Sequence, residues 1–212
     1  MNPTVKFNIT KRLLAANGQP ISGQQLADDF GLSRTAIWKH IKELEEDGYE
    51  IDTVKKKGYV LTTSPDTLQA AKIDQYLTTT RFGRKIHYLQ SCPTTQPIAH
   101  QLAQAGEPDG AIVICEEQTA GKGRLARAWT STQGKGIWMS VIIRPEIPPT
   151  KAPQLTLVAA VAVTRAIEDI ADVRAEIKWP NDLLINGKKC TGILTELQAD
   201  IDRVHAIILG IG

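Results

Sequence analysis

Cysteine is scarce in this sequence, and long apolar runs are absent from it. The three cysteines, Cys92, Cys115 and Cys190, lie far apart and are odd in number, which argues against a disulfide framework or a Cys-x-x-Cys metal site. The longest apolar stretch, residues 155–162, is interrupted by a threonine and is too short to cross a bilayer. Charged residues interrupt any signal-peptide-like core near the N-terminus. We therefore expect a cytoplasmic protein without a membrane partner.

Histidine is also sparse, and neither sign of charge dominates. The four histidines show no ligand spacing, so we assign no metal ligand. Lysine and arginine number 25 against 23 acidic residues, which leaves a formal net charge of +2 at pH 7. Any contact with nucleic acid must therefore come from a local patch. The chain has 212 residues, 42% apolar and 23% charged, which suits a globular protein long enough for two domains.

The first 63 residues carry the pattern of a helix-turn-helix. Apolar residues recur at helical spacing over 5–16. Ser22 is placed to cap a second helix over 23–30, and Ser33 is placed to cap a third over 34–47, which ends at a glycine. Only a Gly-Leu pair separates the second helix from the cap of the third. That short turn is typical of helix-turn-helix modules.

The third of these helices has the layout of a DNA recognition helix. Ile37, Ile41 and Leu44 form one apolar stripe, which we assign to the core. Polar and cationic side chains lie on the opposite stripe and near the N-terminal end, where contacts with base edges and phosphates are made. The candidate DNA-binding residues on this helix are Arg34, Thr35, Lys39 and Lys42.

A basic hairpin is predicted after the third helix. Strand-like runs over 49–54 and 59–61 flank Lys55, Lys56 and Lys57, which would lie over phosphates as a wing. A three-helix interaction module with a solvated lysine run is the alternative. The order of three helices, a tight turn and a basic hairpin favours a winged helix.

A polar joint at 62–65 separates this winged helix-turn-helix domain, residues 1–63, from a second domain, residues 64–212. Helices mix with strands there, and tight turns such as Asn186-Gly187 join several strands, so we expect an α+β fold with a mixed, largely antiparallel sheet. A buried strand at 204–209 runs into the final glycine, so we expect a C-terminal truncation. Expected helices cover 69–77, 96–105 and 154–170; expected strands cover 85–89, 111–115, 137–143, 176–179, 183–185, 190–197 and 204–209.

One segment of the second domain is suited to anions. Residues 118–129 hold Lys122, Arg124 and Arg127 beside closely spaced glycines, which expose backbone N–H groups and cations to a ligand. Trp129 offers a flat face for a base. The segment lacks the GxxxxGK[ST] pattern of a Walker A loop. A merely exposed basic loop is the alternative.

A second segment reads Lys178-Trp179-Pro180-Asn181-Asp182. Its proline interrupts a strand, and an amide and a carboxylate follow at the strand's end. On its own, a plain turn with a solvated acid would explain it. We expect the nearby Cys190 to be a small buried thiol rather than a reactive one.

Together these segments resemble the motifs of biotin–protein ligases. Residues 118–129 are similar to that family's GRGRxGRxW signature, 178–182 match its KWPND motif, and 187–196 resemble its GxKxxGILxE continuation. Residues 93–96 resemble its S-T-N/Q entry to the first substrate-binding helix, and 210–212 resemble the start of its GIGxN strand end. The winged helix matches the bifunctional ligase–repressor branch. The resemblance covers essentially the whole chain, and family members continue with the rest of the catalytic domain and a small β-domain.

The resemblance implies a fold and an activity. The fold is a class II synthetase-like ligase core, and the enzyme is a biotin–[acetyl-CoA-carboxylase] ligase. It activates biotin with ATP and Mg²⁺ to biotinyl-5′-adenylate and passes biotin to a lysine of the biotin carboxyl carrier protein of acetyl-CoA carboxylase. The adenylate-bound homodimer represses biotin genes at operator DNA. Two functions stay open as alternatives: a lipoate–protein ligase, and a non-catalytic transcriptional regulator whose second domain senses a small molecule.

The resemblance also implies roles for single residues. Arg124 and Lys122 hold the acyl-phosphate, Lys189 approaches the biotin carboxyl and α-phosphate, and Asp182 helps to deprotonate the acceptor lysine. The implied catalytic residues are Arg124, Lys189 and Asp182. The implied biotin-binding residues are Thr94, Thr95, Gln118, Gly121, Lys122, Arg124, Lys189 and Gly192. The implied ATP- or adenylate-binding residues are Arg127, Trp129, Asn181 and Asp182, the last two beside the phosphates and Mg²⁺.

Two positions depart from the family's pattern. Lys122 stands where arginine is usual, and it keeps the charge without the planar fork of a guanidinium. Ala126 stands where glycine is usual, and it stiffens the loop. Either change can weaken retention of the adenylate. We expect activity to be kept because Arg124 and Arg127 remain.

Overall fold

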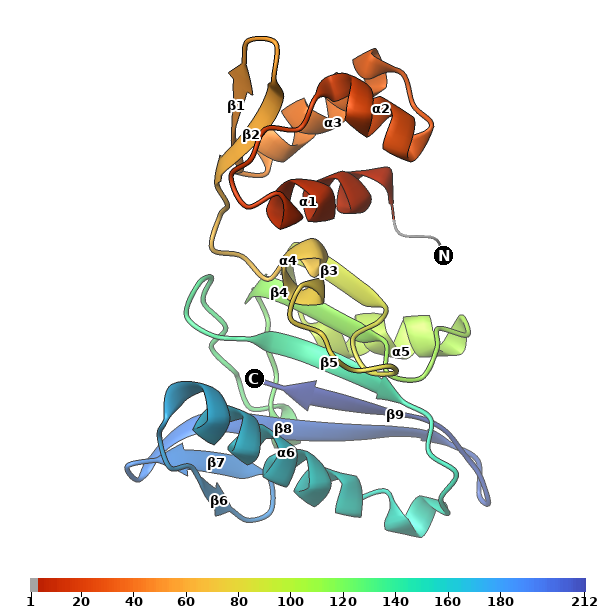
Figure 1. Ribbon diagram of the computed structural model, residues 1–212. Coiled ribbons are helices and arrows are strands. Elements are labelled where there is room, and N and C mark those ends of the chain that lie inside the picture. Colours follow the sequence, from red (N-terminus) through yellow and green to blue (C-terminus); the bar gives the residue numbers. More distant parts are fainter. Residues whose placement is uncertain (1–3) are drawn as a thin grey trace. The chain divides into compact units, whose positions relative to one another are not determined.

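The structure is a computed structural model and describes residues 4–212. The chain divides into two compact units, Met1–Leu77 and Thr78–Gly212 (Figure 1). Each unit has its own core of buried apolar side chains. No helix among the described residues is long and apolar enough to span a membrane.

The first unit is a winged helix, as the sequence predicts. Ser22 accepts a hydrogen bond from the Gln25 N–H at 3.0 Å, and Ser33 accepts one from the Ala36 N–H at 3.1 Å, so both predicted caps are confirmed. Gly31 has a φ of 65°, which ends the second helix in the left-handed conformation and makes the turn. The elements are α1 (Val5–Ala15), α2 (Gly23–Phe30), α3 (Arg34–Glu46), β1 (Glu50–Val54) and β2 (Gly58–Thr63).

A short helix, α4 (Ala70–Asp74), also belongs to this unit. It packs against α1, and its Asp74 forms an ion pair with Lys11. Residues 64–77 therefore pack with the winged helix. The domain boundary after residue 63 stays a prediction, whereas the compact units of the structure divide after Leu77.

The core of the first unit lies where the apolar periodicity places it. Ile37, Ile41 and Leu44 of α3 are almost completely buried, and each such side chain contributes about 1.5–3 kcal/mol of burial free energy. They pack with residues of every other element of the helix-turn-helix and of the wing. The buried set is Ile9, Leu13, Ile21, Leu26, Ala27, Ile37, Ile41, Leu44, Tyr49 and Ile51.

The wing is an antiparallel pair of β1 and β2. Tyr59 exchanges backbone hydrogen bonds with Ile21, which joins the base of the wing to the segment before α2. Gly58 has a φ of 108°, and a Cβ there would lie 2.1 Å from the Ile21 carbonyl oxygen. Only glycine fits this position, because both the backbone conformation and the space exclude a side chain.

The second unit is built on one mixed sheet of seven strands, in the order β3-β4-β5-β9-β8-β7-β6. Only β3 and β4 pair in parallel; the other neighbouring strands pair antiparallel, which confirms the predicted α+β class. The strands are β3 (Ile86–Cys92), β4 (Ile112–Gln118), β5 (Trp138–Ile143), β6 (Glu176–Lys178), β7 (Asp182–Ile185), β8 (Lys188–Ala199) and β9 (Val204–Ile211).

Two helices cover opposite faces of this sheet, α5 (Thr95–Gln104) and α6 (Gln154–Ala171) (Figure 1). Successive strand residues point to opposite faces. Accordingly Ile142 and Ile208 pack with α5, whereas Val141 and Leu209, each one residue along, pack with α6. Because the centre of the sheet is buried on both sides, side chains that contact a ligand are expected at the ends of the strands.

The main differences from the sequence prediction concern lengths. The predicted helix at 69–77 is shortened to α4, and the predicted strand at 190–197 extends to 188–199. Asn186 and Gly187 have φ values of 52° and 73°, so the predicted Asn-Gly hairpin turn between β7 and β8 is confirmed.

The wing provides a test of the first unit. We expect Gly58→Ala to destabilise this unit by about 3 kcal/mol, because it adds a backbone clash to the strain of a positive φ. Gly18→Ala is the matched control: Gly18 has a φ of 78°, but a Cβ there meets nothing within 4 Å, so only about 1 kcal/mol is lost. Native-state hydrogen exchange of buried α3 amides measures both. Equal losses in the two variants would contradict the close packing at Gly58.

Candidate functional site

A cavity of about 350 Å³ lies in the second unit. Six separate segments form its wall: the start of α5, the loop after β4, the start of β5, the start of β7, the first half of β8 and the end of β9. It is within the size range of small-molecule sites. The lining residues are Thr94, Thr95, Gln96, Gln118, Lys122, Gly123, Arg124, Leu125, Arg127, Ala128, Trp129, Met139, Asn181, Asp182, Lys189, Gly192, Ile193, Leu194, Gly210, Ile211 and Gly212.

The loop after β4 folds back on itself as an irregular hairpin. The Trp129 N–H donates to the Gly121 carbonyl at 2.9 Å, and the Gly123 N–H donates to the Arg127 carbonyl at 2.8 Å. At Gly121, a Cβ would lie 2.5 Å from the Trp129 carbonyl oxygen. The glycine therefore lets the two arms of the loop approach each other. Gly121 is buried behind the cavity wall and does not line the cavity. The predicted need for glycine at this position therefore comes from the close approach of the loop's own backbone.

The tip of this loop is bent into an unfavourable conformation. Leu125 and Ala126 have φ values of 57° and 56°, in the left-handed region that glycine tolerates and other residues avoid. Leu125 is also 85% exposed. This gives the departure at Ala126 a physical meaning: a glycine there would adopt the same bend at lower cost, so alanine strains the closed loop as well as stiffening the chain.

Charged side chains from two distant segments meet at the cavity. Nη1 of Arg124 donates a hydrogen bond to Oδ1 of Asn181 at 2.8 Å. The Lys189 ammonium lies 2.7 Å from the Asp182 carboxylate. Lys122 and Arg127 line the same cavity. Four cations therefore gather beside one carboxylate in this part of the described chain, and the surplus of positive charge favours an anionic ligand.

Trp129 is fixed by glycines on either side. A Cβ at Gly192 would lie 3.0 Å from its ring, and a Cβ at Gly212 would lie 2.7 Å from its Nε1. The Lys189 ammonium lies 4.8 Å from the ring centroid, a cation–π arrangement. Gly192 thus makes room for the indole, which itself forms part of the cavity wall.

A hydrogen-bonded polar chain forms the deep end of the cavity. The Thr95 N–H donates to Oε1 of Gln118 at 2.9 Å, and Nε2 of Gln118 donates to Ser131 at 2.8 Å. Oγ1 of Thr95 lies 2.7 Å from Oγ of Ser140, which donates to Oε1 of Gln96 at 2.8 Å. Because the Ser140 proton goes to Gln96, the Thr95 hydroxyl proton points to Ser140 and to Oε1 of Gln118, which lies 3.3 Å away. The Thr95 oxygen therefore keeps lone pairs for a ligand's N–H group.

The same network of hydrogen bonds continues to a carboxylate, Glu196, which was not among the candidate residues. Nε2 of Gln96 donates to Glu196 at 3.1 Å, and His100 lies 2.9 Å from the same oxygen through its Nε2. A carboxylate only accepts hydrogen bonds, so Glu196 fixes the orientation of the Gln96 amide and, through it, the Ser140 hydroxyl. Gln96 and Glu196 are 100 residues apart. The GILxE-like run 192–196 was the one available signal for this partner.

The structure brings nearly all of the predicted ligand-binding residues together. Eleven of the twelve line the one cavity, and Gly121 supports the wall from behind. One incidental expectation is wrong: Cys190 is exposed on β8, whereas Cys92 and Cys115 are buried. Burial raises the pKa of the Cys115 thiol strongly, which keeps it unreactive.

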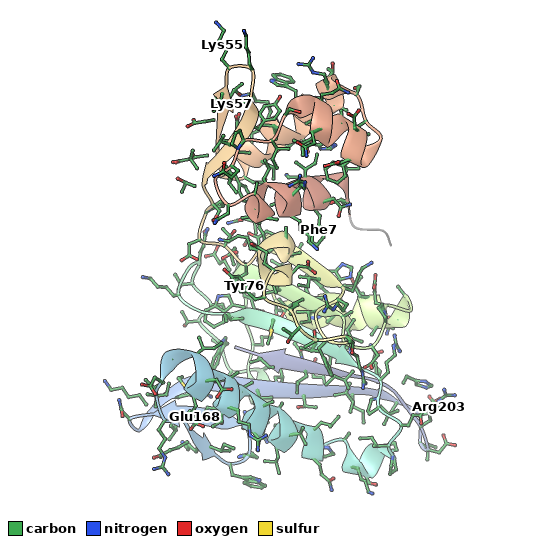
Figure 2. All side chains as sticks on the ribbon, in the orientation of Figure 1. Phe7, Lys55, Lys57, Tyr76, Glu168 and Arg203 are labelled. Atoms are coloured by element: carbon green, nitrogen blue, oxygen red, sulfur yellow. The ribbon has the colours of Figure 1, made fainter. Side chains whose placement is uncertain are left out.

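The predicted DNA-binding residues form a separate surface on the first unit. Arg34, Thr35, Lys39 and Lys42 are exposed on α3, and Lys42 forms an ion pair with Glu45 one turn along. Lys55 and Lys57 lie at the free end of the β1–β2 hairpin (Figure 2). Among residues 4–212, no group of three or more His, Cys, Asp or Glu side chains is arranged to hold a metal ion.

The sequence matches two family models and several curated proteins. Residues 88–212 match the biotin/lipoate A/B protein ligase family, and residues 5–60 match an HTH domain. The chain is 48% identical to the bifunctional ligase/repressor BirA of Bacillus subtilis over 212 residues, which is 100% of this chain and 65% of that protein. It is 34% identical to the Escherichia coli protein of the same name over 200 residues, 94% of this chain and 60% of that protein.

Solved structures of similar fold point the same way. The biotin protein ligase of Aquifex aeolicus in complex with biotin and ATP aligns with a TM-score of 0.50 and 31% identity, over 60% of this chain and 51% of that one. The Leishmania major ligase in complex with biotinyl-5-AMP aligns with a TM-score of 0.52 and 30% identity, over 61% and 56%. The chain spans less than two thirds of the length of the curated relatives. Because the ligase family model covers more than half of it, this chain belongs to the biotin/lipoate A/B protein ligase family.

Proposed function

We propose that this chain is the DNA-binding and central catalytic part of a biotin–protein ligase that also acts as a repressor. It activates biotin with ATP and transfers it to a lysine of a biotin carboxyl carrier protein. The observation that carries the proposal is the convergence of the basic loop, Lys189 and the Asn181–Asp182 pair on one cavity with a polar deep end. The relatives named as ligase/repressors and the ligases solved with biotin and ATP support it.

The first step joins two anions, and the cations of the cavity address that problem. A carboxylate oxygen of biotin attacks the α-phosphorus of ATP, and the bond to pyrophosphate breaks. Arg124 and Lys122 neutralise charge on the phosphoryl group. Lys189 lies between the phosphoryl group and the carboxylate of biotin. Such preorganised charge is the main source of rate acceleration in phosphoryl transfer. Arg127 and Trp129 bind the nucleotide, the latter by stacking on adenine.

In the second step, the amine of the acceptor lysine attacks the carbonyl carbon of the adenylate and AMP leaves. The amine must lose a proton to become a nucleophile and again after attack. Asp182 is the acid among the described lining residues, and it lies 2.7 Å from Lys189. We assign to it the acceptance of that proton. Asn181, which anchors Arg124, holds the phosphate-binding cation in place.

Biotin's ring system suits the deep end of the cavity. Its ureido group offers two N–H donors and one carbonyl acceptor. Thr95 Oγ1 has lone pairs for one N–H, because its own proton is used within the protein, toward Ser140 and Gln118. Thr94 and Gln118 complete the polar set, and Gly192 lets the indole of the cavity wall lie close against β8. A ligand without N–H groups, such as lipoate, would leave these acceptors unpaired, which strongly disfavours it.

Magnesium fits this site as a companion of ATP rather than as a resident ion. One carboxylate together with substrate phosphates is a usual way to bind Mg²⁺, and Asp182 at the cavity supplies that carboxylate. When bound, the ion would neutralise charge on the leaving pyrophosphate.

Cytoplasmic location, expected from the isolated cysteines, is part of the same proposal.

The winged helix links the ligase to gene control. Adenylate persists on the enzyme when acceptor protein is scarce, so its presence reports that further biotin synthesis is not needed. An ordered basic loop would stabilise a surface that pairs two protomers, and the paired winged helices would bind a two-fold symmetric operator. Lys55, Lys56 and Lys57 would contact flanking phosphates.

We expect Arg124→Gly to release biotinyl-adenylate faster, by about tenfold or more, because a charge-assisted contact with the phosphate is lost. The measurement is the off-rate of the adenylate. Arg203→Gly, which removes an exposed arginine from the loop between β8 and β9, is the control and should leave the off-rate unchanged. An unaltered off-rate for Arg124→Gly would refute its role.

We expect Lys189→Ala to lower biotin-dependent pyrophosphate release by about a hundredfold, since the cation that faces both anions is removed. Lys188→Ala removes the exposed neighbouring ammonium and is the control. If Lys189→Ala stays within about twofold of the unmutated protein, Lys189 is only a surface lysine. Release that depends on lipoate rather than biotin would contradict the proposed substrate.

We expect biotinyl-adenylate to strengthen both dimerisation and DNA binding. The coupling is thermodynamic, so the dimer must bind adenylate more tightly by the same factor. Sedimentation velocity with and without adenylate, run beside binding to selected duplex DNA, measures both effects. A dimerisation constant and a DNA affinity that both ignore adenylate would rule out the switch.

A further inference from the structure

Trp38 stands on the outward face of α3, among charged residues. Its side chain is 50% exposed, whereas its neighbours Ile37 and Ile41, on the core-facing side of the helix, are buried. Thr35 lies three residues before it and Lys42 four residues after it, so the three share one stripe of the helix. Trp38 thus borders the stripe of candidate DNA-binding residues on its core-facing side, and it was not among those candidates.

The first unit itself gives no reason for this position. Trp38 is absent from the buried core and from the apolar residues packed around it. Within residues 4–212, its indole N–H has no hydrogen-bond partner and its ring has no cation–π partner. A half-exposed large aromatic side chain beside a polar stripe leaves apolar surface in water, and it gains free energy when a partner covers it.

The surrounding charge identifies the kind of partner. Arg34, Lys39 and Lys42 are exposed on the same helix, and Lys55–Lys57 are exposed on the wing of the same unit. Figure 2 shows Lys55 and Lys57 on the wing. An apolar protein surface would offer these cations no counter-charge beyond the Glu45 partner of Lys42, whereas duplex DNA supplies phosphates for all of them. Inside the major groove, the apolar group that a side chain can meet is the 5-methyl group of thymine.

We propose that Trp38 is a specificity-determining residue that contacts a thymine 5-methyl group in each half-site. The inference rests on the proposed DNA-binding function and adds to it the base that is read. The ring lies in the N-terminal half of α3, the part of a recognition helix that reaches base edges. The neighbouring cations fix the register on the backbone, and Trp38 supplies selectivity for T·A over C·G at one position.

The experiment compares thymine with deoxyuridine, which lacks only the methyl group. Duplexes are selected with the full chain from a random pool, and each thymine is then replaced singly by deoxyuridine at one fixed ionic strength. We expect one thymine per half-site at which replacement weakens wild-type binding by about fourfold, the effect of burying one methyl group. Trp38→Ala should bind the two duplexes equally. Trp38→Phe keeps the ring and should keep most of the difference.

Tyr76→Ala is the matched control, because it removes another exposed aromatic ring of the same compact unit and should behave as wild type. Hydrogen exchange of α3 establishes that each variant is folded. A methyl effect that persists in Trp38→Ala, or no methyl effect in the wild type, would overturn the inference while leaving DNA binding intact. A wild-type chain that selects no duplex at all would overturn DNA binding itself, and the role of Trp38 with it.

Discussion

The hydrogen bond from Arg124 to Asn181 is the contact on which the cavity of the second unit depends. It joins segments 57 residues apart and holds the basic loop against the turn between β6 and β7. The loop needs such an anchor because Leu125 and Ala126 sit in the left-handed region at its tip. A ligand that competes for the Arg124 guanidinium would therefore also change the balance between the closed loop and other conformations. This couples ligand charge to loop order without any further device.

The sheet supplies the rigid frame for this loop. The strand order puts β9 between β5 and β8, so residues far apart in the chain become neighbours around the cavity. Glu196 on β8 reaches Gln96 at the start of α5, and the hydrogen bonds run on through Ser140 to Thr95. With the carboxylate fixed, the Gln96 amide and the Ser140 hydroxyl each have one proton direction in this hydrogen-bonded network. The deep end of the cavity thus presents a defined pattern of acceptors to a ligand.

Local features of the fold were predictable, whereas long-range pairings were not. The caps at Ser22 and Ser33 and the turn at Asn186-Gly187 follow from nearby residues, and the structure has them. The basic loop and the Lys178–Asp182 segment were identified by motif, and their shared cavity agrees with that. The partner of Gln96 depends on strand order, which local patterns do not encode. The exposure of Trp38 is visible only in the structure, because in the sequence an aromatic residue next to a core isoleucine suggests burial.

The most direct test of the account is a calorimetric titration of the protein with biotin and then with ATP and Mg²⁺. The account predicts that one biotin binds per chain, that ATP added afterwards produces heat and pyrophosphate, and that lipoate in place of biotin produces neither. Biotin binding without any subsequent reaction of ATP would reduce the second unit to a sensor. A protein that binds neither biotin nor ATP would contradict the single anion-binding cavity on which the account is built.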